Sequence, residues 1–332
     1  MVQGRASGKI ILIGEHAVVY GQPAIALPFS AVGICATVTE RGQALSVSCA
    51  FYEGLVHQMP KVWESLKHVI RFSLYRIGAP SDPPIHIKID STIPAERGMG
   101  SSAAVAVAVA RALFAFYQRD LSDQELWDIV QSSEKIAHGN PSGVDAATTS
   151  GKQPVFFIKD QPIQPLLIQM DAYLVVGDSG KTGHTLEAVS DVAKLYQEKP
   201  DARSWIEVLG DLTRQAKDFL ASGQAQELGQ AMNQAHTLLQ KLGVSDQVLD
   251  DLVAVARDQG ALGAKLTGGG RGGCMIALAA NQHQAEKIAQ ALERAGACQT
   301  WVQYLGEYDD KSRRHCQGPY QHSPHQILGK ER

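Results

Sequence analysis

Apolar residues recur along this chain with two different periods, and the period changes from segment to segment. Alternating or continuous apolar runs predict strands at 9–13, 31–39, 43–50 and 85–89. We expect 31–39 and 43–50 to pair with each other around the turn at Arg41. Helical spacing of apolar residues predicts helices at 61–77, 101–117 and 123–137. The helix at 101–117 is apolar on almost every side, so we expect it to be buried.

After Gly151 the pattern changes to short strands followed by a run of helices. We predict strands at 155–158, 163–169, 172–177, 274–280 and 299–304, and helices at 184–197, 203–221, 224–242, 246–259 and 282–295. This shift predicts an α/β first domain at 1–165 and an α+β second domain at 166–306. Residues 307–332 are rich in charge and lack apolar periodicity, so we expect a disordered tail there.

Composition narrows the class of protein. The 332 residues are 44% hydrophobic, which is ordinary for a folded protein, and the net charge of −3 gives no general attraction to nucleic acid or an anionic membrane. No apolar run approaches the ~20 residues of a membrane span, and 10–13 is too short for a signal-peptide core. Five cysteines without a C-x-x-C pair predict reduced thiols in a cytoplasmic protein.

The segment from Gly98 to Ala103 predicts an anion site. Two glycines allow close approach of a ligand, and the predicted helix that follows presents free N–H groups and the positive end of its dipole. The alternative is an ordinary turn in which Ser101 or Ser102 caps the helix. The segment is no Walker A loop, and its likeness to the dinucleotide fingerprint is weak because 94–97 separates the strand from the glycines.

Three further segments carry candidate chemistry. Five glycines in six positions, Gly268 to Gly273, predict a backbone-lined loop that faces a phosphate or a substrate rather than a plain turn. Lys9 lies in an apolar strand that Glu15 and His16 follow, which indicates either an anion contact or a buried structural pair. Glu134 lies near a helix C-terminus and Asp145 follows a turn; without other context these two would be a surface residue and a helix cap.

Taken together, these motifs resemble the GHMP small-molecule kinases. The resemblance rests on Gly8-Lys9 with Gly14-Glu15-His16, on Gly98 to Ala103 and on Gly268 to Gly273, in this order, and it covers about residues 4–305. Glu15 to Gly21 and His138 to Ala146 are most similar to the mevalonate kinase branch of that family. Two small departures are Ser7, where proline is common, and Met99, where leucine is usual.

The resemblance implies a fold and a set of roles. It implies an α/β domain followed by a ferredoxin-like α+β domain with the active site between them, and ATP-dependent phosphorylation of the primary hydroxyl of mevalonate with Mg²⁺ as cofactor. The roles implied are catalysis by Asp145 and Lys9, ATP phosphate binding by Glu96, Arg97, Gly98, Met99, Gly100, Ser101, Ser102 and Ala103, metal binding by Ser102 and Glu134, and substrate contact by Glu15, His16, Thr185, Gly269 and Gly270.

Other functions stay open at this point. The near alternative is another kinase of the same family, acting on phosphomevalonate, homoserine or a sugar. A non-catalytic sensor on a kinase fold is more distant, since Lys9, Glu134 and Asp145 are all retained. A dehydrogenase with a Rossmann fold is the third. We expect no nucleic-acid or membrane partner, and the sequence leaves open whether the chain forms a homodimer.

Overall fold

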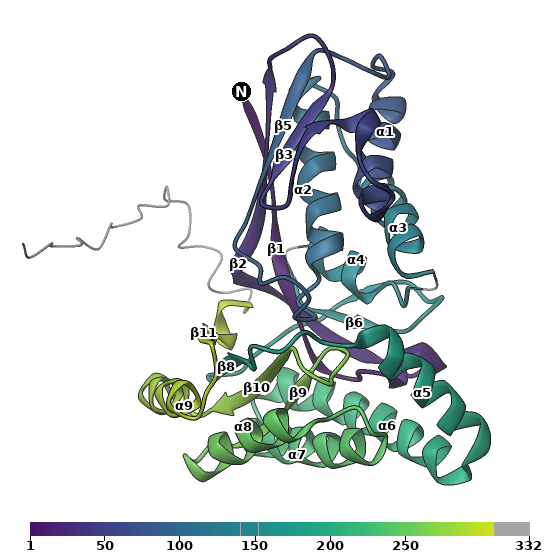
Figure 1. Cartoon of the computed structure of the whole chain (residues 1–332). Helices are drawn as coiled ribbons and strands as arrows, with labels where there is room; N and C mark the ends of the chain where they lie inside the picture. Colours follow the sequence, from purple (N-terminus) through teal and green to yellow (C-terminus); the bar gives the residue numbers. More distant parts are fainter. Residues whose placement is uncertain (140, 152, 309–332) are drawn as a thin grey trace, which may run out of the picture.

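Two long antiparallel strands, β1 (Val2–Ile13) and β2 (Ala24–Glu40), connect the two layers of the molecule. The computed structural model describes residues 1–139, 141–151 and 153–308. Figure 1 shows β1 and β2 running from the upper sheet with its helices down to the lower sheet. At this lower end the Thr267 hydroxyl donates a hydrogen bond of 2.8 Å to the carbonyl of Ile11, which ties β1 to the second sheet.

Within the described residues, the first sheet has seven strands in the order β4-β3-β5-β2-β6-β7, with β1 on the other side of β2. Its remaining strands are β3 (Ser46–Cys49), β4 (Tyr52–Leu55), β5 (Ile85–Ser91), β6 (Val155–Phe157) and β7 (Gln164–Pro165). The predicted pairing of 31–39 with 43–50 is wrong, because β5 lies between β2 and β3. β3 forms its hairpin with β4 and pairs in parallel with β5, a long-range contact that a local pattern does not reveal.

Helices cover one face of this sheet (Figure 1). They are α1 (Glu64–Ile77), α2 (Ser101–Phe116), α3 (Asp123–His138) and the short α4 (Val144–Ser150), with 3-10 turns at Ala17–Tyr20, Val56–Gln58 and Lys61–Trp63. α2 is buried as expected and lies directly on β1, where a Cβ at Gly4 would stand 2.2 Å from the carbonyl oxygen of Ala108. Glycine is therefore required at this crossing.

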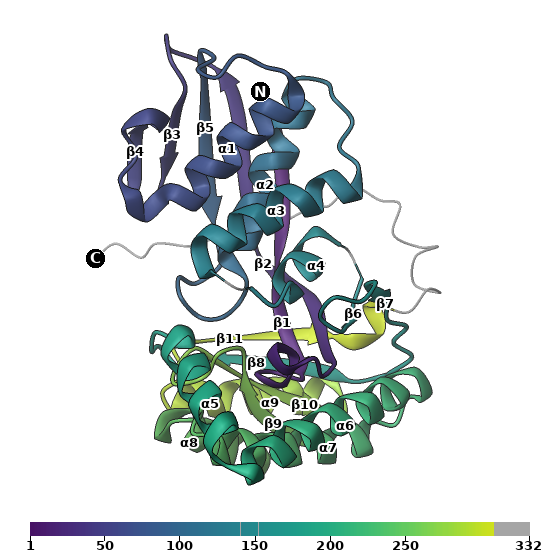
Figure 2. The ribbon, with the colours of Figure 1, turned by 90° about the vertical axis from the view of Figure 1, so that its right-hand side faces the viewer.

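In the part of the chain that the structure describes, the second sheet has four strands in the order β11-β8-β10-β9, with helices packed on the face away from the first sheet (Figure 2). Its strands are β8 (Tyr173–Asp178), β9 (Gly263–Thr267), β10 (Cys274–Ala279) and β11 (Gln299–Tyr304). The helices of this layer are α5 (Thr185–Glu198), α6 (Pro200–Ser222), α7 (Ala225–Lys241), α8 (Gln247–Asp258) and α9 (Gln282–Arg294), and a 3-10 turn at Leu305–Tyr308 follows.

The predicted fold class, mixed α/β content arranged in two units, is confirmed, while several details differ. The strand expected at 163–169 is reduced to Gln164–Pro165, and β9 was not predicted. The Ser122 hydroxyl caps α3 by accepting from the amide of Glu125, and the Glu125 carboxylate pairs with Arg76 at 3.0 Å. No helix within the described residues is long and apolar enough to cross a membrane. The tail expected at 307–332 lies outside the described residues from 309 onward.

Candidate active site

Three loops from distant parts of the chain meet between the two sheets. They are the glycine turn 96–100 before α2, the loop 178–183 after β8 and the glycine loop 268–273 between β9 and β10. The amide of Gly183 donates to the carbonyl of Glu96 at 3.0 Å, and the amide of Gly273 donates to the carbonyl of Lys181 at 2.8 Å. A Cβ on Gly98 would lie 3.7 Å from the Cα of Gly268, so the first and third loops touch through their glycines.

Lys9 is the buried cation at the centre of this junction. It is 3% exposed in the middle of β1, and its Nζ lies 2.9 Å from Oδ1 of Asp145, in the first turn of α4. Its backbone amide donates to the carbonyl of Met99 at 3.0 Å. Gly100 has a φ of +72°, and a Cβ there would stand 2.7 Å from the Lys9 Cγ. The glycine turn therefore fits against the lysine stem, and Lys9 and Asp145 come together as a pair.

The start of α2 lies beside the Lys9 stem and has no side-chain cap. Gly100 is the N-cap residue, and no side chain caps the helix, so the alternative that Ser101 or Ser102 caps it is wrong. The first N–H groups of a helix have no intrahelical partner and carry partial positive charge. They form, with the preceding glycine turn, a place where a phosphate can be held by backbone groups alone.

The Ser102 hydroxyl points to Glu134 on α3 instead. It donates a hydrogen bond of 2.6 Å to Oε1 of Glu134, and His138 Nε2 lies 3.2 Å from the same hydroxyl. Glu134 is 3% exposed, and burial, followed by the charge of Asp145, raises its pKa to about 7. A buried carboxylate that lies near a second carboxylate is a position where a cation would be stabilising.

The donor set fits Mg²⁺ rather than a transition metal. The described residues contain no group of three or more His, Cys, Asp or Glu side chains able to hold a metal. Ser102 and Glu134 supply one hydroxyl and one carboxylate, both oxygen donors. Mg²⁺ is typically held by one or two protein oxygens together with substrate phosphates and water. The pair beside an open helix N-terminus matches that requirement.

His16 is held in a strained backbone conformation against the glycine loop. Its φ is +59°, and its Nε2 lies 3.0 Å from the carbonyl oxygen of Gly269. Burial lowers the pKa of His16 to about 4, so the ring is neutral at pH 7. Because a carbonyl oxygen only accepts, Nε2 carries the proton and Nδ1 is left as an acceptor. Among the described residues, Glu96 and Arg271 also have positive φ, and both lie in loops of this junction.

Glu15 is paired with Lys265, a residue to which the sequence analysis gave no role. Lys265 is 0% exposed, and its Nζ donates to Oε1 of Glu15 and to the carbonyl of Leu266. Burial raises the pKa of Glu15 and lowers that of Lys265, and their mutual attraction opposes both shifts. The sequence signal was a lysine between two apolar residues, Ala264 and Leu266, and it gained its meaning only once β9 was seen to be a buried strand in which a lysine needs an anion. This pair joins β9 to the end of β1.

The other predicted residues take different positions. Gly269 lies against Thr185, because a Cβ there would stand 2.2 Å from the threonine Oγ1, and a Cβ on Gly270 would stand 2.0 Å from the carbonyl of Val244. Met99 and Ala103 are buried, whereas Ser101 is half-buried. The Arg97 side chain turns away to Asp178, with Nε 2.8 Å from Oδ1 of that residue. No role was predicted for Asp178. It is a charged residue at the end of an apolar strand, a sequence signal similar to that of Lys9, a charged residue within an apolar strand.

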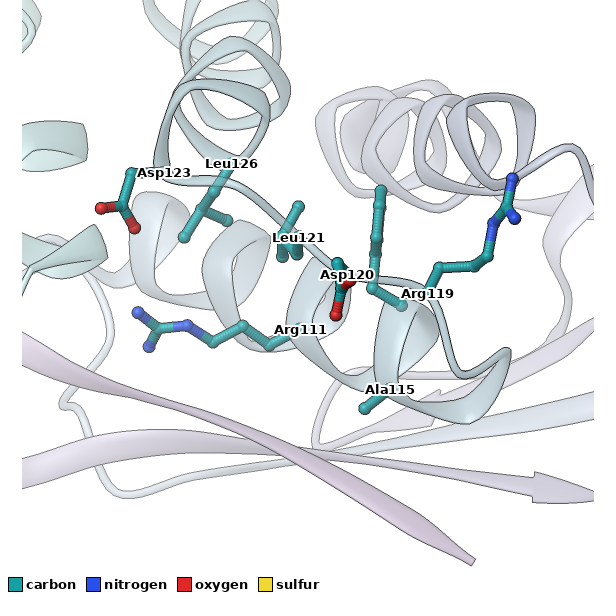
Figure 3. Close-up of a pocket in the computed structure, with 8 residues that line it drawn as sticks. Arg111, Ala115, Arg119, Asp120, Leu121, Asp123 and Leu126 are labelled. Atoms are coloured by element: carbon teal, nitrogen blue, oxygen red, sulfur yellow. The ribbon is translucent and has the colours of Figure 1, made fainter.

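A hollow elsewhere on the surface carries none of these groups. It measures about 240 Å³ and lies at the C-terminal end of α2, where Arg111, Arg119 and Asp120 line it (Figure 3). At 1.5 Å per residue this end of the helix is roughly 20 Å from the glycine turn. We therefore place the candidate active site at the loop junction and not at this hollow.

Comparison with known proteins gives one consistent family. The GHMP kinases N terminal domain matches residues 61–152, and the GHMP kinases C terminal domain matches residues 216–298. A curated mevalonate kinase of Pyrococcus horikoshii is 36% identical, over 89% of this chain and 93% of its own length. The crystal structure of L. major mevalonate kinase in complex with R-mevalonate is 30% identical with a TM-score of 0.79, covering 92% of this chain and 96% of that chain. A mevalonate kinase structure from methicillin-resistant Staphylococcus aureus is 33% identical with a TM-score of 0.70. The match covers 92% of this chain and 99% of that chain.

The buried Glu15–Lys265 pair makes a prediction about stability. Lys265→Met leaves the Glu15 carboxylate buried without its cation, so we expect the free energy of unfolding to fall by about 3–5 kcal/mol. Glu15→Leu combined with Lys265→Met removes both charges and should recover at least half of that loss. Urea unfolding of the two variants measures both effects.

Lys88→Met is the matched control, because it breaks an ion pair with Asp90 in which both side chains are more than half exposed. It should change the free energy of unfolding by less than about 1 kcal/mol. A Lys265→Met protein as stable as the Lys88→Met control would show that the buried pair does not join the two layers.

Proposed function

Because this chain belongs to the GHMP kinase family, we propose that it transfers the γ-phosphoryl group of ATP to the primary hydroxyl of mevalonate. The products are 5-phosphomevalonate and ADP, and the hydroxyl proton leaves to the enzyme and then to solvent. The observation that carries this proposal is the Lys9–Asp145 pair of 2.9 Å beside the uncapped N-terminus of α2. Its relatives with at least 30% identity that are described above are all mevalonate kinases, which favours mevalonate over phosphomevalonate, homoserine or a sugar.

We assign the ATP phosphates to the glycine turn and the first turn of α2. Phosphoryl transfer passes through a loose transition state, so the enzyme acts mainly by positioning and by stabilising charge on the phosphoryl oxygens. The N–H groups that follow Gly100 supply fixed donors for these oxygens without reorganisation. Gly98 and Gly100 have no side chain and Ala103 has only a methyl group, so the phosphates can approach the backbone closely.

Asp145 is the group we assign to the acceptor alcohol. Its side chain is 32% exposed while Lys9 beneath it is 3% exposed, so the carboxylate can reach a ligand from a fixed support. The ammonium group of Lys9, 2.9 Å from Oδ1, holds this carboxylate where it can accept the hydroxyl proton. The ammonium group of Lys9 also stabilises negative charge that develops on the alcohol or γ-phosphoryl oxygens.

Ser102 and Glu134 would hold the Mg²⁺ ion of the nucleotide. A bound divalent cation neutralises charge on the β- and γ-phosphate oxygens and orients them for in-line transfer. The chain's own contribution is to keep the Glu134 carboxylate oriented, which the Ser102 hydroxyl does through its hydrogen bond of 2.6 Å. Burial of Glu134 beside Asp145 favours a cation at this position.

The remaining predicted residues would contact mevalonate. His16 is neutral and offers Nδ1 as a hydrogen-bond acceptor, which suits a hydroxyl group of the substrate. Thr185 and Gly269 adjoin each other at the junction, while Gly270 lies against Val244 and Glu15 is paired with Lys265. The substrate would therefore lie between domains at 1–165 and 166–306, the division that we propose.

We also propose the cytoplasm as the place of action, as a step of the mevalonate route to isoprenoids. Among the described cysteines, Cys35, Cys49, Cys274 and Cys298 are free thiols. Free thiols are compatible with a reducing compartment. The substrate and the product are small anions, which agrees with a chain whose overall charge attracts neither nucleic acid nor membrane.

A coupled assay of ADP release tests the proposed function. The purified chain with ATP and Mg²⁺ should release ADP with mevalonate at a kcat/KM at least about 10²-fold above that with phosphomevalonate, homoserine or galactose. Omission of the alcohol gives the background hydrolysis of ATP. Preference for any of the other three alcohols, or ADP release that no alcohol increases, contradicts the proposal.

Asp145→Asn tests the catalytic assignment. The substitution keeps the size of the side chain, so we expect the protein to fold, but it removes the charge and the ability to take a proton. A positioned general base is worth about 10²–10⁴ in rate, so kcat should fall by at least about 10². ATP affinity, measured by direct titration, should stay within several-fold of the parent. A folded variant with near-normal kcat would remove Asp145 from the reaction.

A further inference from the structure

The Arg97 side chain is engaged at all three of its nitrogens. Nε donates to Oδ1 of Asp178 at 2.8 Å, Nη2 donates to the carbonyl of Gly180 at 3.0 Å, and Nη1 donates to the carbonyl of Ala95 at 3.2 Å. The Asp178 side chain is 7% exposed and that of Arg97 is 17% exposed. Arg97 belongs to the glycine turn before α2, whereas Asp178 ends β8 of the second sheet. The pair thus connects the two layers of the molecule.

The carboxylate of Asp178 also shapes the loop that follows β8. Its Oδ1 accepts a second hydrogen bond, of 2.8 Å, from the amide of Gly180, whose φ is +74°. One carboxylate oxygen therefore fixes the turn of the 178–183 loop and holds Arg97 at the same time. Two backbone bonds beside it, from Gly183 to Glu96 and from Ser179 to Gly273, each measure 3.0 Å and extend the contact to the glycine loop.

We propose that Arg97 and Asp178 form a latch that sets the spacing between the glycine turn 96–100 and the loops 178–183 and 268–273. The inference rests on the proposed function in one respect, namely that phosphoryl transfer occurs between these loops. Arg97 is then a positioning residue that acts through Asp178, and its charge does not contact a phosphate. A misplacement of about 1 Å between reacting groups costs about 10²-fold in rate, so such a latch has a large effect on kcat.

A double-mutant cycle separates the latch from a direct phosphate contact. With Arg97→Ala, Asp178→Ala and the double variant, we expect each single change to lower kcat by about 10- to 100-fold. The double variant should be no slower than the slower single variant, because both changes remove the same contact. Arg97→Lys, which keeps the charge but not the forked geometry, should recover only a small part of the loss.

A direct phosphate contact gives a different result. In that case Arg97→Ala raises the dissociation constant of ATP at least about 10-fold, Asp178→Ala leaves both ATP affinity and kcat unchanged, and Arg97→Lys restores much of the binding. This outcome overturns the latch. Arg76→Ala is the matched control, because it breaks an arginine–carboxylate pair of 3.0 Å between α1 and α3. Its kcat should stay within about 3-fold of the parent value, because an ion pair near the surface contributes little to stability.

Hydrogen exchange of the free protein tests the latch without any assumption about the substrate. The amide of Gly183 keeps its acceptor, the carbonyl of Glu96, in both single variants. We expect exchange of this amide to become at least about 10-fold faster in Arg97→Ala and in Asp178→Ala, and to stay unchanged in Arg76→Ala. Unchanged exchange in the first two variants contradicts the latch even if mevalonate is the substrate. Faster exchange in a chain that does not phosphorylate mevalonate supports the latch and rejects the proposed function alone.

Discussion

A buried ammonium group in the middle of β1 is the constraint on which the candidate site depends. Burying an unpaired charge is costly, so Lys9 requires a carboxylate within reach, and Asp145 at the first turn of α4 provides it. The lysine stem also requires a residue without a side chain beside it, which is why Gly100 ends the turn before α2. One charge therefore fixes the relative positions of β1, α2 and α4.

Contacts between the layers extend this constraint to the second sheet. The Glu15–Lys265 pair joins the end of β1 to β9, and Arg97 with Asp178 joins the glycine turn to β8. The glycine loop 268–273 passes close to Gly98, and Gly98 and Gly268 both have positive φ values that other residues rarely adopt. The site thus consists of backbone segments that approach closely because their residues are small, and of ion pairs that hold these segments in position. Such a preorganised arrangement suits phosphoryl transfer, in which positioning and charge stabilisation supply most of the catalysis.

Local pattern was sufficient for most helices and failed where pairing is long-range. The apolar helix α2 and its glycine turn were predictable because one segment carries both signals, helical spacing and a helix start. The order of β2, β5 and β3 was not, because β5 (Ile85–Ser91) comes after β3 (Ser46–Cys49) in the sequence but lies between β2 and β3 in the sheet. Strand order is decided by tertiary packing, which a local pattern does not carry. Lys265 and Asp178 were missed because each was judged from its own motif, while their partners Glu15 and Arg97 lie more than 80 residues away.

We propose that Lys9 and Asp145 act on the reacting hydroxyl group as one unit. Single-turnover rates of phosphoryl transfer from ATP to mevalonate, measured for the parent, Lys9→Met, Asp145→Asn and the double variant, test it most directly. Groups that act as a unit are strongly non-additive, so the double variant should be within about 3-fold of the slower single variant. Losses that multiply in the double variant, so that the two residues contribute independently, would contradict this account.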